Sequence, residues 1–417
     1  MKKFFHYSFL ICLCCGLIFL ICGGLTSTAF GVYLPYLMEE TGCSNTEINL
    51  INSCRSFAAF GAKLVCIAIF TKLKARKMTA LACGLCAAAF FTFAFAPNLI
   101  FYYVAGVLLG LSNGLGTMIL CSVILRRWFK IGIGTVLGIV ASCTAIAGAV
   151  VPPLVTAGVA SMGVSKTMMI EGIIVVVLAA LIILFLRNEP ADMGLTAFGE
   201  GQEEVKKEKK PAKSAAKAGG FLPKKEILFV MVAAFMVGAT NCYNSVNSLV
   251  LKEIGLEATS IAAVLSVYGT TLLFGKFGFG VLNDIFGGFV TNLIFTLCFT
   301  AGLGIILLWT PSLPLIMVAT ILISLGMTLC STSLSTWAAD LTKKEDYDAS
   351  VGKFQSSFAA SAMILSFLPG PIADLTGSYR PAVMIFFIMS LLIIALILRA
   401  YAVNARLAKK AAEDVVK

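Results

Sequence analysis

Apolar runs of about 20 residues, each long enough to cross the hydrocarbon core of a bilayer as a helix, recur along the whole chain. In lipid, a helix satisfies every backbone hydrogen-bonding group within such a run. The pattern predicts twelve membrane-spanning helices. They lie near residues 9–37, 46–70, 78–96, 99–125, 133–160, 167–186, 226–250, 259–283, 289–309, 313–337, 351–374 and 380–401.

A charged segment separates the first six runs from the last six. It mixes Lys and Glu between positions 203 and 217 and has few large apolar residues, a composition typical of a flexible linker. We predict an N-terminal six-helix bundle at 1–187 and a flexible charged cytoplasmic linker at 188–225. A C-terminal six-helix bundle with a short basic tail follows at 226–417, and we expect residues 200–220 to be poorly ordered.

The two halves share their polar and glycine positions. Residues 26–42 in helix 1 and 240–255 in helix 7 each run through polar residues to a final glycine. The fifth helix of each half carries late prolines, at Pro152-Pro153 and at Pro369-Gly370-Pro371. Parallel six-helix repeats are one way in which transporters build two domains. The sequence therefore predicts an all-α membrane protein of two pseudo-symmetric six-helix bundles.

Composition and charge extend this prediction to the membrane and its sides. Hydrophobic residues make up 59% of the chain and charged residues 13%, against about 45–50% and 25% in soluble domains. The net charge is +11, and most of the 32 Lys and Arg fall in segments that the positive-inside rule assigns to the cytoplasm when both termini are cytoplasmic. We predict a multi-pass protein of the inner (plasma) membrane whose basic surface meets lipid and not nucleic acid.

Cysteine and histidine suggest no metal site. Most of the 14 cysteines lie inside apolar runs, where they act as small packing residues and not as a disulfide framework. The one histidine, His6, precedes the first run. The sequence has no nucleotide-binding loop and no Cys/His/Asp arrangement typical of an enzyme, so we predict no cofactor, no metal and no enzymatic activity.

The turn after helix 8 resembles a motif of the major facilitator superfamily. The stretch Gly280-Val-Leu-Asn-Asp284-Ile-Phe-Gly287 is similar to the G-x-x-x-D-x-x-G turn of that family. In the first half, Thr71 and Lys74 replace the aspartate and the final glycine, while a basic end with Arg76 remains. The resemblance implies a gate of Gly280, Asp284, Gly287 and Arg76. Asp284 is expected to contact a neighbouring helix when the cavity is closed on the inside.

Three further stretches resemble the oxalate/formate antiporter and monocarboxylate transporter branch of this superfamily. They are Arg127-Trp128-Phe129, the run 187–195 and the run 374–379. Helix 5 lacks the G-P-x-x-G-G ending of drug-efflux antiporters. The resemblance implies alternating-access transport of a small organic anion, a mono- or dicarboxylate, by an antiporter or a proton symporter.

Basic residues inside the spans are candidates for binding that anion, because a charge in the membrane is costly. Lys276 lies eight residues before Asp284, about 12 Å along the helix. In the family that the chain resembles, a basic residue there meets the substrate carboxylate; otherwise a lysine snorkels to the headgroups. Lys63 is its counterpart in the first half. Arg55 suits either a carboxylate or a structural pair.

Acids are scarce in the spans. Glu171 alone lies clearly within one, near its outer end, and we expect an interfacial residue or a partner of Lys166 more than a proton carrier. Cations without acidic partners favour an anionic ligand. The polar face of helix 7 and several tyrosines would line the site. The predicted substrate-binding residues are Lys276, Arg55, Lys63, Tyr33, Asn244 and Tyr268.

Other functions stay open at this point. A drug or metabolite exporter would carry a cavity without functional cations and richer in aromatic residues. A non-transporting membrane sensor would carry a large soluble output domain. The partners that we expect are a small anionic substrate, the bilayer and protons as a coupling ion, with the chain acting as a monomer.

Overall fold

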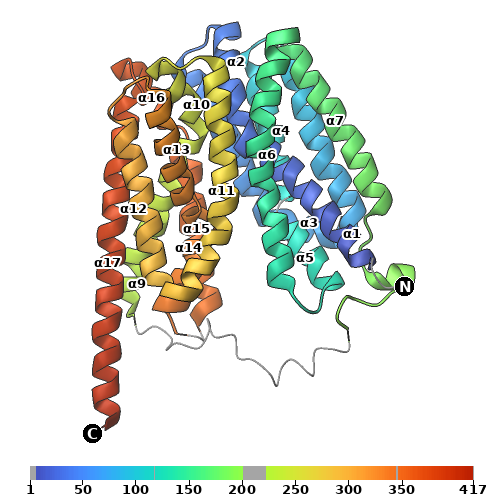
Figure 1. The fold of residues 1–417 in the computed structure, drawn as a ribbon. Helices are drawn as coiled ribbons and strands as arrows, with labels where there is room; N and C mark the ends of the chain where they lie inside the picture. The colour runs from blue at the N-terminus through green and yellow to red at the C-terminus, as the bar shows by residue number, and fades with distance from the viewer. Residues whose placement is uncertain (1–5, 117, 201–221, 344–345, 417) are drawn as a thin grey trace. The chain divides into compact units, whose positions relative to one another are not determined.

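The computed structural model describes residues 6–116, 118–200, 222–343 and 346–416 (Figure 1). Throughout these residues the chain is helical apart from turns and one isolated bridge between Phe129 and Phe198. The chain divides into two compact units, Met1–Lys210 and Pro211–Lys417. The all-α prediction is confirmed, and the predicted disorder at 200–220 falls almost wholly outside the described residues.

The first unit contains six predicted spans, several of them broken into shorter pieces. Its α-helices are α1 (Tyr7–Phe19), α2 (Leu34–Thr41), α3 (Asn45–Ala94), α4 (Leu99–Leu115), α5 (Met118–Trp128), α6 (Ile133–Met162) and α7 (Val164–Phe185). Between α1 and α2 lie the π-helix η1 (Leu20–Ala29) and the 3₁₀ turn η2 (Phe30–Tyr33), and η3 (Pro190–Met193) follows α7. Helix α3 contains two predicted spans, because the backbone leaves the helical region at Lys74.

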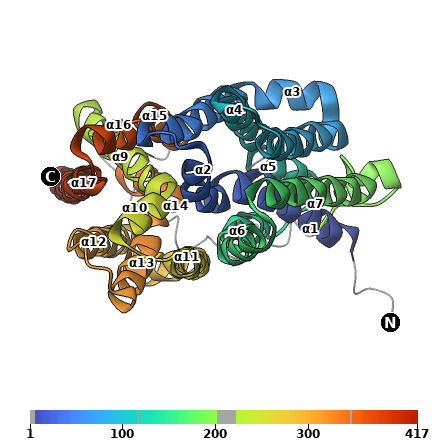
Figure 2. The ribbon, with the colours of Figure 1, turned by 90° about the horizontal axis from the view of Figure 1, so that it is seen from above.

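The second unit contains the remaining six spans. Its helices are α9 (Lys224–Thr240), α10 (Tyr243–Ile254), α11 (Ala258–Phe286), α12 (Gly288–Ile306), α13 (Leu313–Met327), α14 (Leu329–Leu341), α15 (Tyr347–Leu365), α16 (Pro369–Thr376) and α17 (Arg380–Val416). Helices α11, α12 and α13 lie side by side when this unit is viewed from above (Figure 2). Helix α17 continues well past the predicted span, so the predicted basic tail is helical up to Val416.

Length and hydropathy identify the spans within the described residues. Ten helices are long and apolar enough to cross a membrane, and the bent pair α9–α10 makes an eleventh. The twelfth predicted span, 46–70, forms the part of α3 before Lys74. The many exposed large apolar side chains on these helices, such as Leu64, Phe274 and Leu391, are suited to contact with lipid.

Glycine turns occupy matching places in the two units and support the internal repeat. Gly42 ends helix 1 and Gly255 ends helix 7, both in the left-handed conformation with φ of 64° and 102°. Such a conformation costs little only at glycine, which lacks a Cβ atom. The final glycine that the two runs share in sequence thus has the same backbone role in both units.

A glycine stripe on α4 lets α3 approach closely. A Cβ atom would lie 2.9 Å from the Ile51 carbonyl oxygen at Gly106 and 2.2 Å from the Arg55 carbonyl oxygen at Gly110. At Gly114 it would lie 2.4 Å from Ala62 Cβ. Small residues at a four-residue spacing allow this contact in membranes, where helices gain little from the hydrophobic effect. The stripe fixes the position of Arg55 relative to α4.

Candidate functional site

Helix interruptions mark the first and fourth spans of each unit. In the first unit, η1 and η2 interrupt helix 1, and the fourth span divides into α4 and α5. In the second unit, α9 and α10 meet at a 41° bend, and α13 gives way to α14 at Thr328. Interrupted segments at corresponding positions of two repeats indicate where a transporter binds its substrate. Each unit therefore has a candidate region at these interruptions, and the second unit has a further break in its fifth span, between α15 and α16.

The candidate region of the first unit is built on the carbonyl groups of η1. Arg55 Nη1 donates to the Thr26 carbonyl oxygen at 2.6 Å. Asn113 Nδ2 on α4 donates to the Cys22 carbonyl oxygen at 3.0 Å and to Thr26 Oγ1 at 3.1 Å. A π-helix departs from the normal hydrogen-bond ladder, and such departures are frequent at functional sites. Here, side-chain donors from α3 and α4 bind carbonyl oxygens of the π-helix.

Arg55 is held inside the first unit. It is 8% exposed, donates to the Thr26 carbonyl, and its guanidinium lies 5.9 Å from the centre of the Phe30 ring. These contacts supply the structural pairing that the sequence left open as one alternative. Its predicted role in binding substrate stays a prediction.

Tyr33 is buried beside Glu171. The Tyr33 hydroxyl interacts electrostatically with the Glu171 carboxylate. The Cys86 thiol also interacts electrostatically with this carboxylate. Within the described part of the chain, neither the hydroxyl nor Glu171 Oε2 has a hydrogen-bond partner at normal distance. Lys166 is exposed and five residues away on α7. The prediction that Glu171 is an interfacial residue or a Lys166 partner is therefore corrected: its carboxylate points into the bundle.

Lys63 differs from Arg55, two turns away on the same helix. Its side chain is exposed, while its backbone nitrogen would lie 3.1 Å from a Cβ atom placed on Gly114. The structure thus ties the Lys63 backbone to α4. A role in substrate binding stays a prediction.

The candidate region of the second unit lies where α11 meets the break between α13 and α14. Gly275 packs on this break, since a Cβ atom there would lie 2.8 Å from Thr328 Oγ1. The next residue, Lys276, is half-buried and interacts electrostatically with Cys330 on α14. Tyr268 is buried two turns earlier, and its carbonyl oxygen accepts a 2.6 Å hydrogen bond from Ser324 Oγ. Two predicted site residues, Tyr268 and Lys276, thus lie on α11 beside the break between α13 and α14.

The polar face of α10 is partly satisfied within its own helix. Tyr243 Oη donates to Asn247 Oδ1 at 3.0 Å, and the Asn244 amide nitrogen of the backbone donates to the Asn241 carbonyl. The Asn244 side chain is half-buried. Asn244 is thus placed just after the α9–α10 bend, where the sequence predicted a polar lining.

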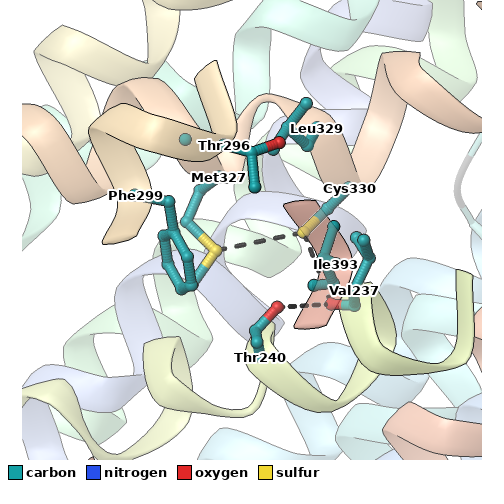
Figure 3. A pocket seen from close by; sticks show the side chains of 9 residues that line it. Val237, Thr240, Thr296, Phe299, Met327, Leu329, Cys330 and Ile393 are labelled. Atoms are coloured by element: carbon teal, nitrogen blue, oxygen red, sulfur yellow. Dashed lines mark hydrogen bonds between the residues drawn. The ribbon is translucent and has the colours of Figure 1, made fainter. Parts of the chain in front are cut away.

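A small pocket lies at the same break in the second unit (Figure 3). Cys330 Sγ lies 4.0 Å from the Val237 carbonyl oxygen and 3.9 Å from Met327 Sδ. The lining residues are Val237, Thr240, Thr296, Phe299, Gly326, Met327, Leu329, Cys330 and Ile393. The lining is mainly apolar, and the volume of the pocket is about that needed for one water molecule. The pocket therefore marks loose packing at the break and does not suit an organic anion.

The stretch predicted as a gate forms a turn at Gly287. Gly287 ends α11 with φ 81° and ψ 166°, and Lys74 adopts φ 58° and ψ 179° at the equivalent place of the first unit. Arg76 Nε donates to the Leu186 carbonyl oxygen at 2.7 Å. The turn thus persists in both units although a lysine replaces one glycine. Gly280 faces open space and Asp284 is exposed, so the gate contact of Asp284 stays a prediction.

Two of the branch motifs pack against each other in the first unit. Arg127 Nη1 forms an ion pair with Glu189 Oε1 at 2.7 Å, and Trp128 Nε1 donates to the Arg187 carbonyl at 3.3 Å. Phe198 then pairs with Phe129, with backbone hydrogen bonds of 2.9 Å on either side. The motifs therefore fasten residues 187–198 to the end of the fourth span.

Sequence reasoning missed Asn113 and the contact between Tyr33 and Glu171. Asn113 could have been found, because an amide inside an apolar helix is costly unless it is paired. The contact of Tyr33 with Glu171 depends on the interruption of helix 1, which hydropathy does not record.

Comparisons with known proteins agree with this architecture. The structure is similar to that of a nucleoside transporter, NupG, with a TM-score of 0.70 and 13% identity, over 95% of this chain and 99% of that one. It is similar to a D-xylose–proton symporter, with a TM-score of 0.70 and 11% identity, over 94% and 97% of the two chains. A bacterial homologue of the human lysosomal transporter Spinster gives a TM-score of 0.64 at 13% identity, over 97% and 96%.

At these identities the likeness shows the fold alone. The sequence itself matches the family model of the Major Facilitator Superfamily at residues 16–245 and again at 228–415. The two matches cover nearly the whole chain, and each corresponds to about one six-helix half. With its helical architecture and its repeated interrupted spans, the chain belongs to the major facilitator superfamily.

Proposed function

We propose that this transporter carries a small organic anion, a mono- or dicarboxylate, by alternating access. The observation that supports the proposal is the position of Lys276: a half-buried cation on α11, next to the break between α13 and α14. Charged residues within membrane spans are rare and often mark substrate pathways. In this proposal, the Lys276 ammonium group binds a substrate carboxylate in each transport cycle.

Lys276 is the main anion ligand in this proposal, with Tyr268 and Asn244 as neutral neighbours in the second unit. Arg55 and Lys63 are the cations of the first unit. Arg55 would act mainly by shaping helix 1, since its guanidinium already binds the Thr26 carbonyl. We further propose the inner membrane with both termini cytoplasmic, the domain limits 1–187, 188–225 and 226–417, and a monomer.

A counterflow assay in proteoliposomes tests the substrate class. Vesicles loaded with formate, lactate, oxalate or succinate are assayed for uptake of the same labelled acid. We expect counterflow with at least one acid, its near-complete loss in Lys276→Gln and partial retention in Lys276→Arg, which keeps the charge but changes the geometry. Lys353→Gln is the matched control, because Lys353 is exposed at the start of α15. Counterflow with nucleosides or sugars and with none of the acids would contradict the anion proposal.

The gate is a second part of the proposal. Asp284→Asn should shift the protein toward inward-open states, because a charge-assisted hydrogen bond contributes about 1.5–3 kcal/mol. Modification of single cysteines on the cytoplasmic side measures the shift. Unchanged modification rates would show that Asp284 makes no gating contact.

A further inference from the structure

The first unit contains an acid that the anion site does not use. Glu171 lies on α7, seven residues after its start at Val164, and so about 10 Å along a helix of 22 residues. Its Oε2 atom is buried and, within the described residues, has no hydrogen-bond partner. No described lysine or arginine forms an ion pair with it. An ionised carboxylate in such surroundings costs several kcal/mol.

The groups around Glu171 are neutral and come from three neighbouring elements. Tyr33 on η2 presents its buried hydroxyl, and Cys86 on α3 presents its thiol. Ser112 on α4 interacts with that thiol, and its hydroxyl is buried without a hydrogen-bond partner among the described residues. Hydroxyl groups can donate or accept, so they can serve either the protonated or the ionised carboxyl group.

The neutral thiols of Cys22 on η1 and Cys83 on α3 lie 3.9 Å apart and interact with Cys86. Four other titratable groups on α7 and its neighbours make contacts elsewhere or are exposed. Tyr7 of α1 donates to the Phe185 carbonyl at the opposite end of α7. Cys143 of α6 donates to the Ile139 carbonyl of its own helix. Lys166 is exposed, and Arg76 binds the Leu184 and Leu186 carbonyls. Among the described residues, no cation is therefore seen to compensate a charge on Glu171.

We propose that Glu171 is a proton-binding site of the transport cycle, with Tyr33 as its positioning residue. The proton comes from water, binds a Glu171 carboxyl oxygen and returns to water, with no other bond made or broken. Tyr33 lies in η2, at the end of the interrupted part of helix 1. A change in the shape of this interruption would move the hydroxyl relative to the carboxyl group and so change the affinity for the proton. The inference rests on the proposed function only for its link to transport.

Infrared difference spectroscopy of the protein in phosphatidylethanolamine/phosphatidylglycerol vesicles tests the site without any substrate. Acidification should produce the carbonyl stretch of a protonated carboxylic acid. The band should be missing in Glu171→Gln and shifted in Tyr33→Phe. The matched control is Glu257→Gln, an exposed acid at the start of α11, which should leave the band unchanged. A spectrum of Glu171→Gln that equals the wild-type spectrum would overturn the proposal.

Transport provides the second measurement. With an acid that gives counterflow, an inward proton gradient should stimulate uptake by the wild type and not by Glu171→Gln, while Glu171→Asp should restore part of the stimulation. Equal stimulation in Glu171→Gln would also overturn the proposal. A protein that carries none of the four acids yet shows the Glu171 band refutes the substrate class and supports the proton site. Counterflow without the Glu171 band would support the substrate class and refute the proton site.

Discussion

Helix 1 and helix 7 occupy the same place in the two repeats but are interrupted in different ways. Helix 1 changes to a π-helix and then a 3₁₀ turn from Leu20 to Tyr33, and charged or amide side chains from other helices bind its carbonyl groups. Helix 7 bends by 41° over two residues, and local neutral contacts such as Thr240 Oγ1 to the Val237 carbonyl suffice. A long interruption needs donors from its neighbours, whereas a short bend supplies its own.

This difference also separates the roles of the two buried cations. Arg55 is almost fully buried and bound to a backbone carbonyl of the long interruption, whereas Lys276 is half-buried beside a thiol at a short one. In the first unit, the charge of Arg55 therefore stabilises the fold of the unit itself. The predictions below test that division.

The largest expected effect is the loss of the Arg55 donor. Arg55→Met should destabilise the protein by about 3 kcal/mol, because a hydrogen bond from a charged group contributes about 1.5–3 kcal/mol and the Thr26 carbonyl would be left unpaired. Thermal unfolding in detergent measures the change, with the exposed Arg126→Met as control. Full stability with lost counterflow would instead assign Arg55 to the substrate.

Next comes the packing that holds Arg55 in place. Gly110→Ala places a methyl group 2.2 Å from the Arg55 carbonyl oxygen, and overpacking of this kind costs about 1–3 kcal/mol. We expect a lower melting temperature and lower yield. Gly61→Ala on α3 is the matched control, because a Cβ atom there meets nothing within 4 Å. Equal effects of both substitutions would argue against a close α3–α4 contact.

The smallest expected effect is a gain in stability. Lys74 has a φ of 58°, a conformation that costs a non-glycine residue about 1–3 kcal/mol, partly offset in glycine by its greater unfolded-state entropy. Lys74→Gly should therefore raise stability by about 1 kcal/mol, and Gly287→Ala at the equivalent turn should lower it. Lys72→Gly, within the helix, serves as control and should be destabilising. A stability loss in Lys74→Gly would show that the lysine side chain holds the turn.

The sequence predicted the spans and turns, but it did not predict the hydrogen bonds inside the bundles. Apolar run length predicts a spanning helix because the bilayer fixes its length, and the glycines at 42, 255 and 287 predict turns through their backbone freedom. The π-helix of η1 has no such signal, because its carbonyl groups are bound by residues 29 and 91 positions away. Glu171 was misjudged for the same reason: the neighbour of its carboxylate depends on how helix 1 bends.

The order of translation around Arg55 also has a consequence for biosynthesis. The side-chain partners of Arg55, the Thr26 carbonyl and the Phe30 ring, lie on helix 1 and are translated before it. Gly110, which packs on the Arg55 backbone, is translated roughly 55 residues later, which takes several seconds at about 5–20 residues per second. During that time helix 1 alone can offset the apparent insertion cost of the charge, about 2.5–3.5 kcal/mol. Helix 1 therefore supports the insertion of the second span before α4 arrives, and a chain that lacks helix 1 should leave that span poorly anchored.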